Sequence, residues 1–119
     1  MSIGERPTFD REAMLDRLDG DLGLARELVT TYLEEAPAMR ADLRDAVESR
    51  EPSNLERAAH SLRGALAAVS ASAAVDLADQ LETESRNGDL SGSLGRTARL
   101  EAQLELLEQA LLSYLREAR

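Results

Sequence analysis

The amino-acid sequence predicts an all-α fold: an up-and-down antiparallel four-helix bundle with a short additional N-terminal helix. No stretch of the chain alternates apolar and polar residues with the period of two that a half-buried strand requires. Alanine, leucine, glutamate and arginine dominate the sequence, and all four favour helix. The connections between the predicted helices are short, and short connections make neighbouring helices antiparallel.

The first two predicted helices differ in length. The short one covers about residues 10–18, where Asp10 can cap the start and Gly20 ends it. The long one covers about residues 21–49. Its apolar stripe consists of Leu28, Tyr32, Met39, Leu43 and Val47. Pro37 falls inside this pattern and removes a backbone donor, so we expect the long helix to bend or split there.

The third predicted helix begins in the segment REPSNLE and runs to about Val69. Two starts fit the sequence, namely a capping box formed by Ser53 and Glu56, or Pro52 as the first helical residue. The apolar stripe consists of Leu55, Ala58 or Ala59, Leu62, Leu66 and Val69.

The last two predicted helices follow two polar breaks. In the stretch SASAA, Ser70 and Ser72 are candidate caps for a helix that ends near Arg86, before the stop signal Asn-Gly-Asp. A fifth helix starts after residues 91–93 and runs to the end of the chain. Its stripe consists of Leu100, Leu104, Leu107, Leu111 and Leu115.

Length and composition exclude several classes of function. The 119 residues fit one domain, 1–119. The net charge of −9 repels phosphate backbones and anionic lipids, so we expect neither a nucleic-acid nor a membrane partner. The chain has no cysteine and one histidine, which excludes disulfides, a thiol nucleophile and a multi-histidine metal site. We therefore predict no metal site and no cofactor.

The N-terminal region carries no targeting signal. It lacks the apolar stretch of a signal peptide, and no apolar run in the chain is long enough to span a bilayer. We therefore expect a soluble cytoplasmic protein. The initiating Met1 and the length of one full domain favour a free-standing protein over a piece of a larger kinase.

The only histidine, His60, lies away from the apolar stripe of the third predicted helix. At about 100° per residue, it should stand in solvent on the outside of the bundle. The same face carries Ser53, Glu56, Arg57, Arg63, Gly64 and Ala67. Neutral imidazole is a competent nucleophile near pH 7, and an uncovered ring favours reaction with a large partner protein. The alternative is an ordinary surface histidine.

Two neighbours favour a function for His60. Arg63 lies one turn further on, where it can meet negative charge added to the ring. Gly64 costs roughly 1 kcal/mol relative to alanine inside a helix, and it leaves space that a docking partner can occupy. Ala67 has a small side chain and leaves the same face of the helix unobstructed. The alternatives are a solvated charge for Arg63 and tight helix packing for Gly64.

Two blocks of the sequence resemble a known family. The run from His60 to Gly64, HSLRG, resembles the signature of histidine-containing phosphotransfer (HPt) domains. The block from Leu77 through Leu81-Glu82 to RNGD is similar to the family's second motif, and the resemblance covers nearly the whole chain. It implies a helical bundle whose histidine accepts a phosphoryl group from a receiver-domain aspartate and passes it on, without kinase activity of its own.

The resemblance also implies roles for individual residues. It implies that Arg63 interacts with the phosphate, that Gly64 gives the partner access, and that Glu82 hydrogen-bonds the imidazole. The geometry agrees for Glu82: His60 is ten residues before the turn at Ser70 and Glu82 twelve after it, at nearly equal height in an antiparallel hairpin. The alternative is that Glu82 is an ordinary acidic residue on a helix surface. Ser70 stands where the family usually has glycine.

The sequence thus predicts a phosphocarrier of a multistep phosphorelay that is phosphorylated on His60. Its expected partners are response-regulator receiver domains and a hybrid sensor histidine kinase, with Mg²⁺ supplied by the receiver. The expected docking surface includes Glu56, Arg57 and Ala67, and we expect a monomer. The alternative is a non-catalytic docking module that binds a receiver or dimerises through the fifth-helix stripe. A stand-alone enzyme is disfavoured because the chain has no glycine-rich phosphate loop.

Overall fold

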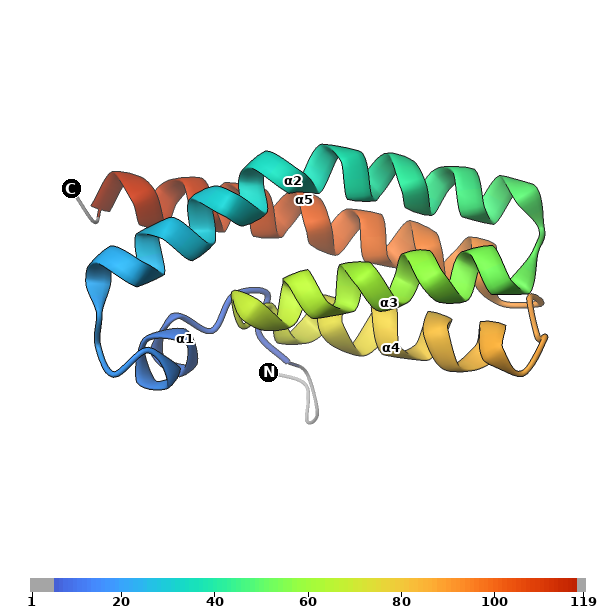
Figure 1. Cartoon of the computed structure of the whole chain (residues 1–119), viewed down its shortest axis with the longest axis horizontal. Coiled ribbons are helices and arrows are strands. Elements are labelled where there is room, and N and C mark those ends of the chain that lie inside the picture. The colour runs from blue at the N-terminus through green and yellow to red at the C-terminus, as the bar shows by residue number, and fades with distance from the viewer. Residues whose placement is uncertain (1–5, 118–119) are drawn as a thin grey trace.

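The computed structural model describes residues 6–117, and these residues form helices and no strands, which confirms the all-α prediction. The helices are α1 (Arg11–Arg17), α2 (Leu22–Ser49), α3 (Pro52–Ala68), α4 (Ser72–Arg86) and α5 (Ser93–Glu117). The helices α2 to α5 run alternately up and down (Figure 1), and α5 packs against α2 as well as α4. The bundle is therefore closed, as predicted.

Leucine and alanine stripes from all four long helices meet in one core. The fully buried leucines are Leu43, Leu55, Leu62, Leu66, Leu81, Leu100, Leu104, Leu107 and Leu111. Burying each such side chain contributes about 1.5–3 kcal/mol relative to leaving it in water. The predicted stripe of α5 lies inside this core. The bundle itself covers these leucines, so they are not exposed for a helical dimer.

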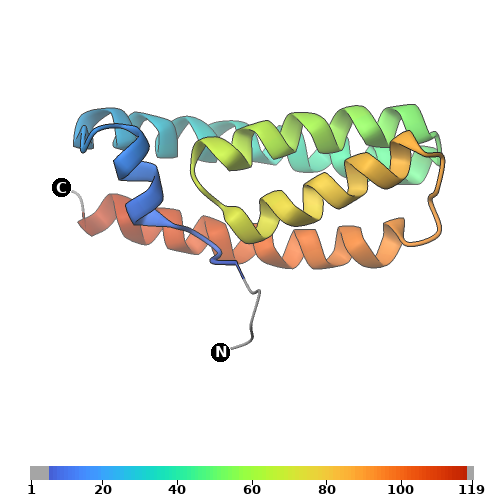
Figure 2. The same ribbon diagram turned by 90° about the horizontal axis from the view of Figure 1, so that it is seen from below.

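The short helix α1 fills a gap that the unequal helix lengths leave open. The helices α2 and α5 are about ten residues longer than α3 and α4, so about 15 Å of both extend beyond the α3–α4 hairpin. Figures 1 and 2 both place α1 at this end, and in Figure 2 it lies between the start of α2 and the end of α5. Its Met14 is fully buried, and the Phe9 ring meets Tyr114 edge-on with centroids 5.8 Å apart.

The structure confirms some of the predicted helix starts and decides between two alternatives for α3. The Asp10 carboxylate caps α1 by accepting from the Ala13 amide at 3.1 Å, as predicted. Pro52 is the first residue of α3, so the alternative capping box of Ser53 and Glu56 is wrong. Proline fits the first turn because the amide it lacks would have no partner there.

The long helix α2 continues through Pro37 as one element. Its axis changes direction near the middle (Figure 1), so the bend was predicted correctly and the split did not occur. Flanking turns of α2 bury Val29 and Leu43 against the rest of the bundle, and this packing holds the two halves together.

The turn between α3 and α4 is pinned by the N-terminal part of the chain. Ser70 has a φ of 57°, in the left-handed region that favours glycine. The prediction that Ser70 or Ser72 caps α4 is wrong, because neither side chain makes a capping hydrogen bond. The Arg17 guanidinium donates to the Ser70 hydroxyl at 2.6 Å and to the Ala67 carbonyl at 2.9 Å. The Asp10 amide donates to the Ser70 carbonyl at 2.9 Å. These bonds hold a turn that a non-glycine residue adopts at a cost.

Candidate functional site

His60 lies near the middle of α3 with its ring turned away from the core. Its side chain is 64% exposed, whereas Ala59 and Leu62, which belong to the apolar stripe of α3, are fully buried. The exposure expected from the helical period is confirmed. The ring is open to a large partner.

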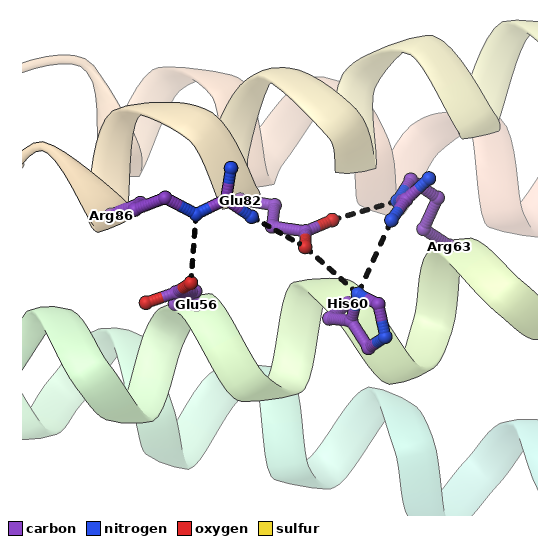
Figure 3. A network of polar contacts seen from close by, with 5 residues as sticks. All are labelled: Glu56, His60, Arg63, Glu82 and Arg86. Carbon is purple, nitrogen blue, oxygen red and sulfur yellow. Dashed lines mark hydrogen bonds and ion pairs between the residues drawn. The ribbon is translucent and has the colours of Figure 1, made fainter.

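The carboxylate of Glu82 meets the imidazole from the neighbouring helix α4. Its Oε2 atom is 2.8 Å from Nδ1 of His60 (Figure 3), and only 5% of the Glu82 side chain is exposed. The antiparallel α3–α4 hairpin brings the two residues to the same height, as their distances from the turn predict. Because its carboxylate is buried, Glu82 is not an ordinary helix-surface acid.

Two arginines complete the surroundings of this carboxylate. Nε of Arg63 donates to Oε1 of Glu82 at 2.7 Å, and Nη2 of Arg86 donates to Oε2 at 3.0 Å. Nε of Arg86 donates in turn to Glu56 on α3, also at 3.0 Å. A buried carboxylate needs such partners, because an unpaired one is costly to remove from water.

The network determines the charge of Glu82. Burial by itself would raise the pKa of the Glu82 carboxyl, but the hydrogen bonds from His60 and Arg63 and the charge of Arg63 outweigh it. The pKa of Glu82 is therefore lowered, and the side chain is ionised at neutral pH. An ionised carboxylate only accepts hydrogen bonds, so its partner on the ring must donate.

The tautomer of His60 follows from a competition at Nδ1. Glu82 Oε2 lies 2.8 Å from this nitrogen and Arg63 Nη2 lies 3.2 Å from it. The carboxylate requires a proton on Nδ1 and the guanidinium requires a lone pair there, so only one of the two is a hydrogen bond. We assign the shorter, charge-assisted contact with Glu82 as that bond. Nε2, which points away from Glu82 in Figure 3, then keeps its lone pair.

The surface beside the ring is open at Gly64. A Cβ atom added there would meet no atom within 4 Å, so tight helix packing does not explain the glycine. Ala67, one turn further along α3, is also exposed. Small residues at these two positions leave room for a partner next to the imidazole.

Comparison with known proteins decides the family. The model of the Hpt domain family matches residues 27–110, which is most of the chain. The chain belongs to the HPt domain family. Among solved structures, it is similar to histidine-containing phosphotransfer protein B (HptB) from Pseudomonas aeruginosa PAO1, with a TM-score of 0.86 and 16% identity. The match covers 97% of this chain and 100% of that chain, and it shows the shared fold. No curated protein sequence matches the chain.

Membership of the HPt family gives this domain a role in histidine phosphotransfer within a phosphorelay, and HPt domains are phosphocarriers that interact with receiver domains. Among residues 6–117, no group of three or more histidine, aspartate or glutamate side chains is arranged to hold a metal ion. Within the same range, no helix is long and apolar enough to cross a membrane.

The remaining predicted site residues of this HPt domain lie around the imidazole ring of His60. Arg57 is exposed and lines a shallow depression of about 470 Å³ together with His60 and Glu56. It also borders a groove of about 450 Å³ between α2 and α3. Glu56 accepts a hydrogen bond from Arg86, a residue of the second motif for which the sequence predicted no role. The spacing of four residues between Glu82 and Arg86 on one helix is the signal that could have linked them.

Proposed function

We propose that this HPt domain accepts a phosphoryl group on Nε2 of His60 from the aspartyl phosphate of a receiver domain and passes it to another receiver. One observation carries the proposal: the Oε2 atom of the buried Glu82 lies 2.8 Å from Nδ1 of the exposed His60 ring, which assigns the ring proton to Nδ1 and leaves Nε2 as the free nitrogen. This arrangement makes the outward nitrogen the nucleophile and keeps it reachable by a large partner.

The transfer is a displacement at phosphorus. The lone pair of Nε2 forms the bond to phosphorus as the bond to the aspartate oxygen breaks, and the aspartate leaves as a carboxylate. The proton on Nδ1 stays on the ring, and its bond to Glu82 stabilises the positive charge that develops there. Mg²⁺ bound to the receiver is expected to neutralise the transferring group. The domain thus acts as a carrier without kinase activity of its own.

Two neighbours of His60 assist in this proposal. Arg63, whose side chain is 35% exposed, lies close enough to the ring to turn toward a phosphoryl group on Nε2. Gly64 admits the partner's surface beside the ring. The docking surface extends over Glu56, Arg57 and Ala67, which surround the imidazole on α3.

The test compares the unmodified chain with His60→Gln, using a phosphorylated receiver domain as donor. We expect acid-labile phosphate on the unmodified chain and none on the variant. The chain has a single histidine, so loss of the label in this variant also assigns its position. Equal labelling of both proteins would contradict the proposal. A receiver that binds the unmodified chain without transfer would indicate a docking module instead.

A further inference from the structure

Arg86 joins two carboxylates that belong to different helices. Its Nε donates to Glu56 on α3 and its Nη2 donates to Glu82 on α4, both at 3.0 Å (Figure 3). A guanidinium has a planar set of donors, so one arginine can hold both oxygens at fixed positions. Lysine carries the same charge but lacks this planar arrangement.

The contact with Glu82 falls on the oxygen that matters for the ring. Oε2 accepts from Arg86 and is also the acceptor for Nδ1 of His60. Arg63 holds the other oxygen, Oε1. The carboxylate is therefore held at both ends, and its plane is oriented so that Oε2 faces the imidazole. Loss of either contact would free it to turn.

The two arginines are not equivalent if the proposed function holds. In that function Arg63 turns toward the phosphoryl group and leaves Oε1. Arg86 is tied to Glu56 and would then be the remaining cation on Glu82. Without it, a largely buried carboxylate would lose its charge partner at the moment when more negative charge arrives.

We infer that Arg86, anchored by Glu56, is a positioning residue that holds Glu82 so that Nδ1 of His60 keeps its proton and Nε2 stays free to react. Arg86 acts through Glu82 and need not touch the phosphate. Its importance for transfer rests on the proposed function, whereas its effect on the tautomer can be measured without any phosphoryl donor.

The test uses the ring nitrogens of the single histidine. In ¹⁵N-labelled protein, two-bond proton–nitrogen spectra report which nitrogen carries the proton, and only His60 contributes signals. We expect the unmodified chain to show a protonated Nδ1 and a bare Nε2. In Arg86→Gln, a larger share of molecules should carry the proton on Nε2. Glu56→Gln should move the signals in the same direction by less, because Arg86 stays on Glu82 without its anchor.

Two further variants separate positioning from charge. Arg86→Lys keeps the charge but cannot bridge both carboxylates in the same way, so it should restore the signals only in part. Arg57→Gln is the matched control, since it removes one positive charge from the same exposed surface and Arg57 lies beside His60. The two ring-nitrogen signals should stay at their original positions in this control.

The rate of phosphorylation by phosphoramidate gives a second readout. In this reaction Nε2 forms the bond to phosphorus, the phosphorus–nitrogen bond of the donor breaks, and ammonia leaves. We expect Arg86→Gln to slow the reaction about two- to fivefold, the size of effect expected for one partly exposed charged contact. The slowing should follow the loss of the Nδ1-protonated form across the variants.

Two results would overturn the inference: ring-nitrogen signals unchanged in Arg86→Gln, or the same change in Arg57→Gln. Full restoration by Arg86→Lys would also overturn it, because charge alone would then suffice. The proposed function is tested separately. If the tautomer depends on Arg86 but no receiver transfers phosphate to the unmodified chain, the inference stands and the proposed function fails.

Discussion

At the scale of single residues, the site combines an exposed ring with a carboxylate that solvent hardly reaches. His60 is mostly exposed, whereas Glu82, 2.8 Å away, is almost fully buried. Burial makes the hydrogen bond between them stronger than it would be in water. It also makes the carboxylate dependent on Arg63 and Arg86 for its charge. The chemistry of the site is therefore shared between an exposed ring and a buried carboxylate beside it.

Gly64→Ala should separate folding from docking. We expect the free energy of unfolding to rise by about 0.5–1 kcal/mol, because alanine is the better helix former and the added Cβ meets no atom. Transfer from a phosphorylated receiver should slow about tenfold or more, since a small displacement of the reacting groups is costly. Urea unfolding and transfer kinetics check the two effects. Reaction with the small donor phosphoramidate should slow far less, and equal slowing would contradict a docking role.

Glu82→Gln should make stability less dependent on pH. Because folding lowers the pKa of Glu82 from its usual 4.5, the unfolded chain binds more protons in acid, and stability rises with pH in that window. The contribution is complete above about pH 5 and is lost as the pH falls through the lowered pKa. At neutral pH we expect the variant to be about 1–2 kcal/mol less stable.

Urea unfolding between pH 3 and pH 7 measures this difference. The control is Glu27→Gln, which removes an exposed carboxylate on α2 and should change stability by less than about 0.5 kcal/mol. A difference between the Glu82 variant and the unmodified chain that stays constant down to pH 3 would speak against the lowered pKa.

At the scale of helices, the α3–α4 hairpin depends on a clamp from outside it. The Arg17 guanidinium bonds the last turn of α3 and the Ser70 hydroxyl, and the chain before α1 bonds the same turn. The hairpin carries both His60 and Glu82, so the clamp also maintains the relative height of the two. The short helix α1 thus supports a site that it does not touch.

A double-mutant cycle tests this clamp. We expect Arg17→Ala to lower the free energy of unfolding by about 1–2 kcal/mol, through loss of several partly exposed hydrogen bonds. In a Ser70→Gly background the same change should cost about 0.5–1 kcal/mol less. There the hydroxyl partner is absent and glycine adopts the left-handed φ without strain. Urea unfolding of the four proteins measures the coupling, and additive effects would show that Arg17 does not support the Ser70 turn.

Regular geometry made much of the site predictable. A helix turns by a constant angle per residue, so the exposure of His60 followed from the stripe. Nearly equal distances from the turn at Ser70 placed Glu82 beside His60. The link from Arg86 to Glu56 was not predictable in this way. A long side chain chooses among many rotamers, and the choice depends on where the neighbouring helix lies. Similarly, packing rather than local sequence decided that α2 bends at Pro37 without splitting.

At the scale of the whole molecule, the bundle formed by residues 6–117 buries the apolar stripes of its long helices in its own core. The leucines at the centre of the α5 stripe are buried. The exposed leucines of α5 are Leu94, Leu106 and Leu112, and any two of them lie either on different sides of the helix or far apart along it. The net charge of −9 adds repulsion between copies. These features favour a monomer.

Light scattering coupled to size exclusion should therefore give a mass near 13.0 kDa. We expect this value to stay constant from low to high micromolar concentration at physiological salt. A mass that doubles with concentration would contradict the expectation. In that case Leu106→Gln and Leu112→Gln would identify the side of α5 that associates.

The exposed face of His60 limits how partner proteins can follow one another in a relay. The core lies behind α3, so every protein that reaches the ring must approach from the same side, and two cannot do so together. For the proposed carrier, donor and acceptor would alternate in a ping-pong cycle and compete for the same surface. An acceptor in large excess would occupy the empty carrier and slow its loading. Throughput would then depend on the ratio of the two partners in the cell as well as on the rate of the chemical step.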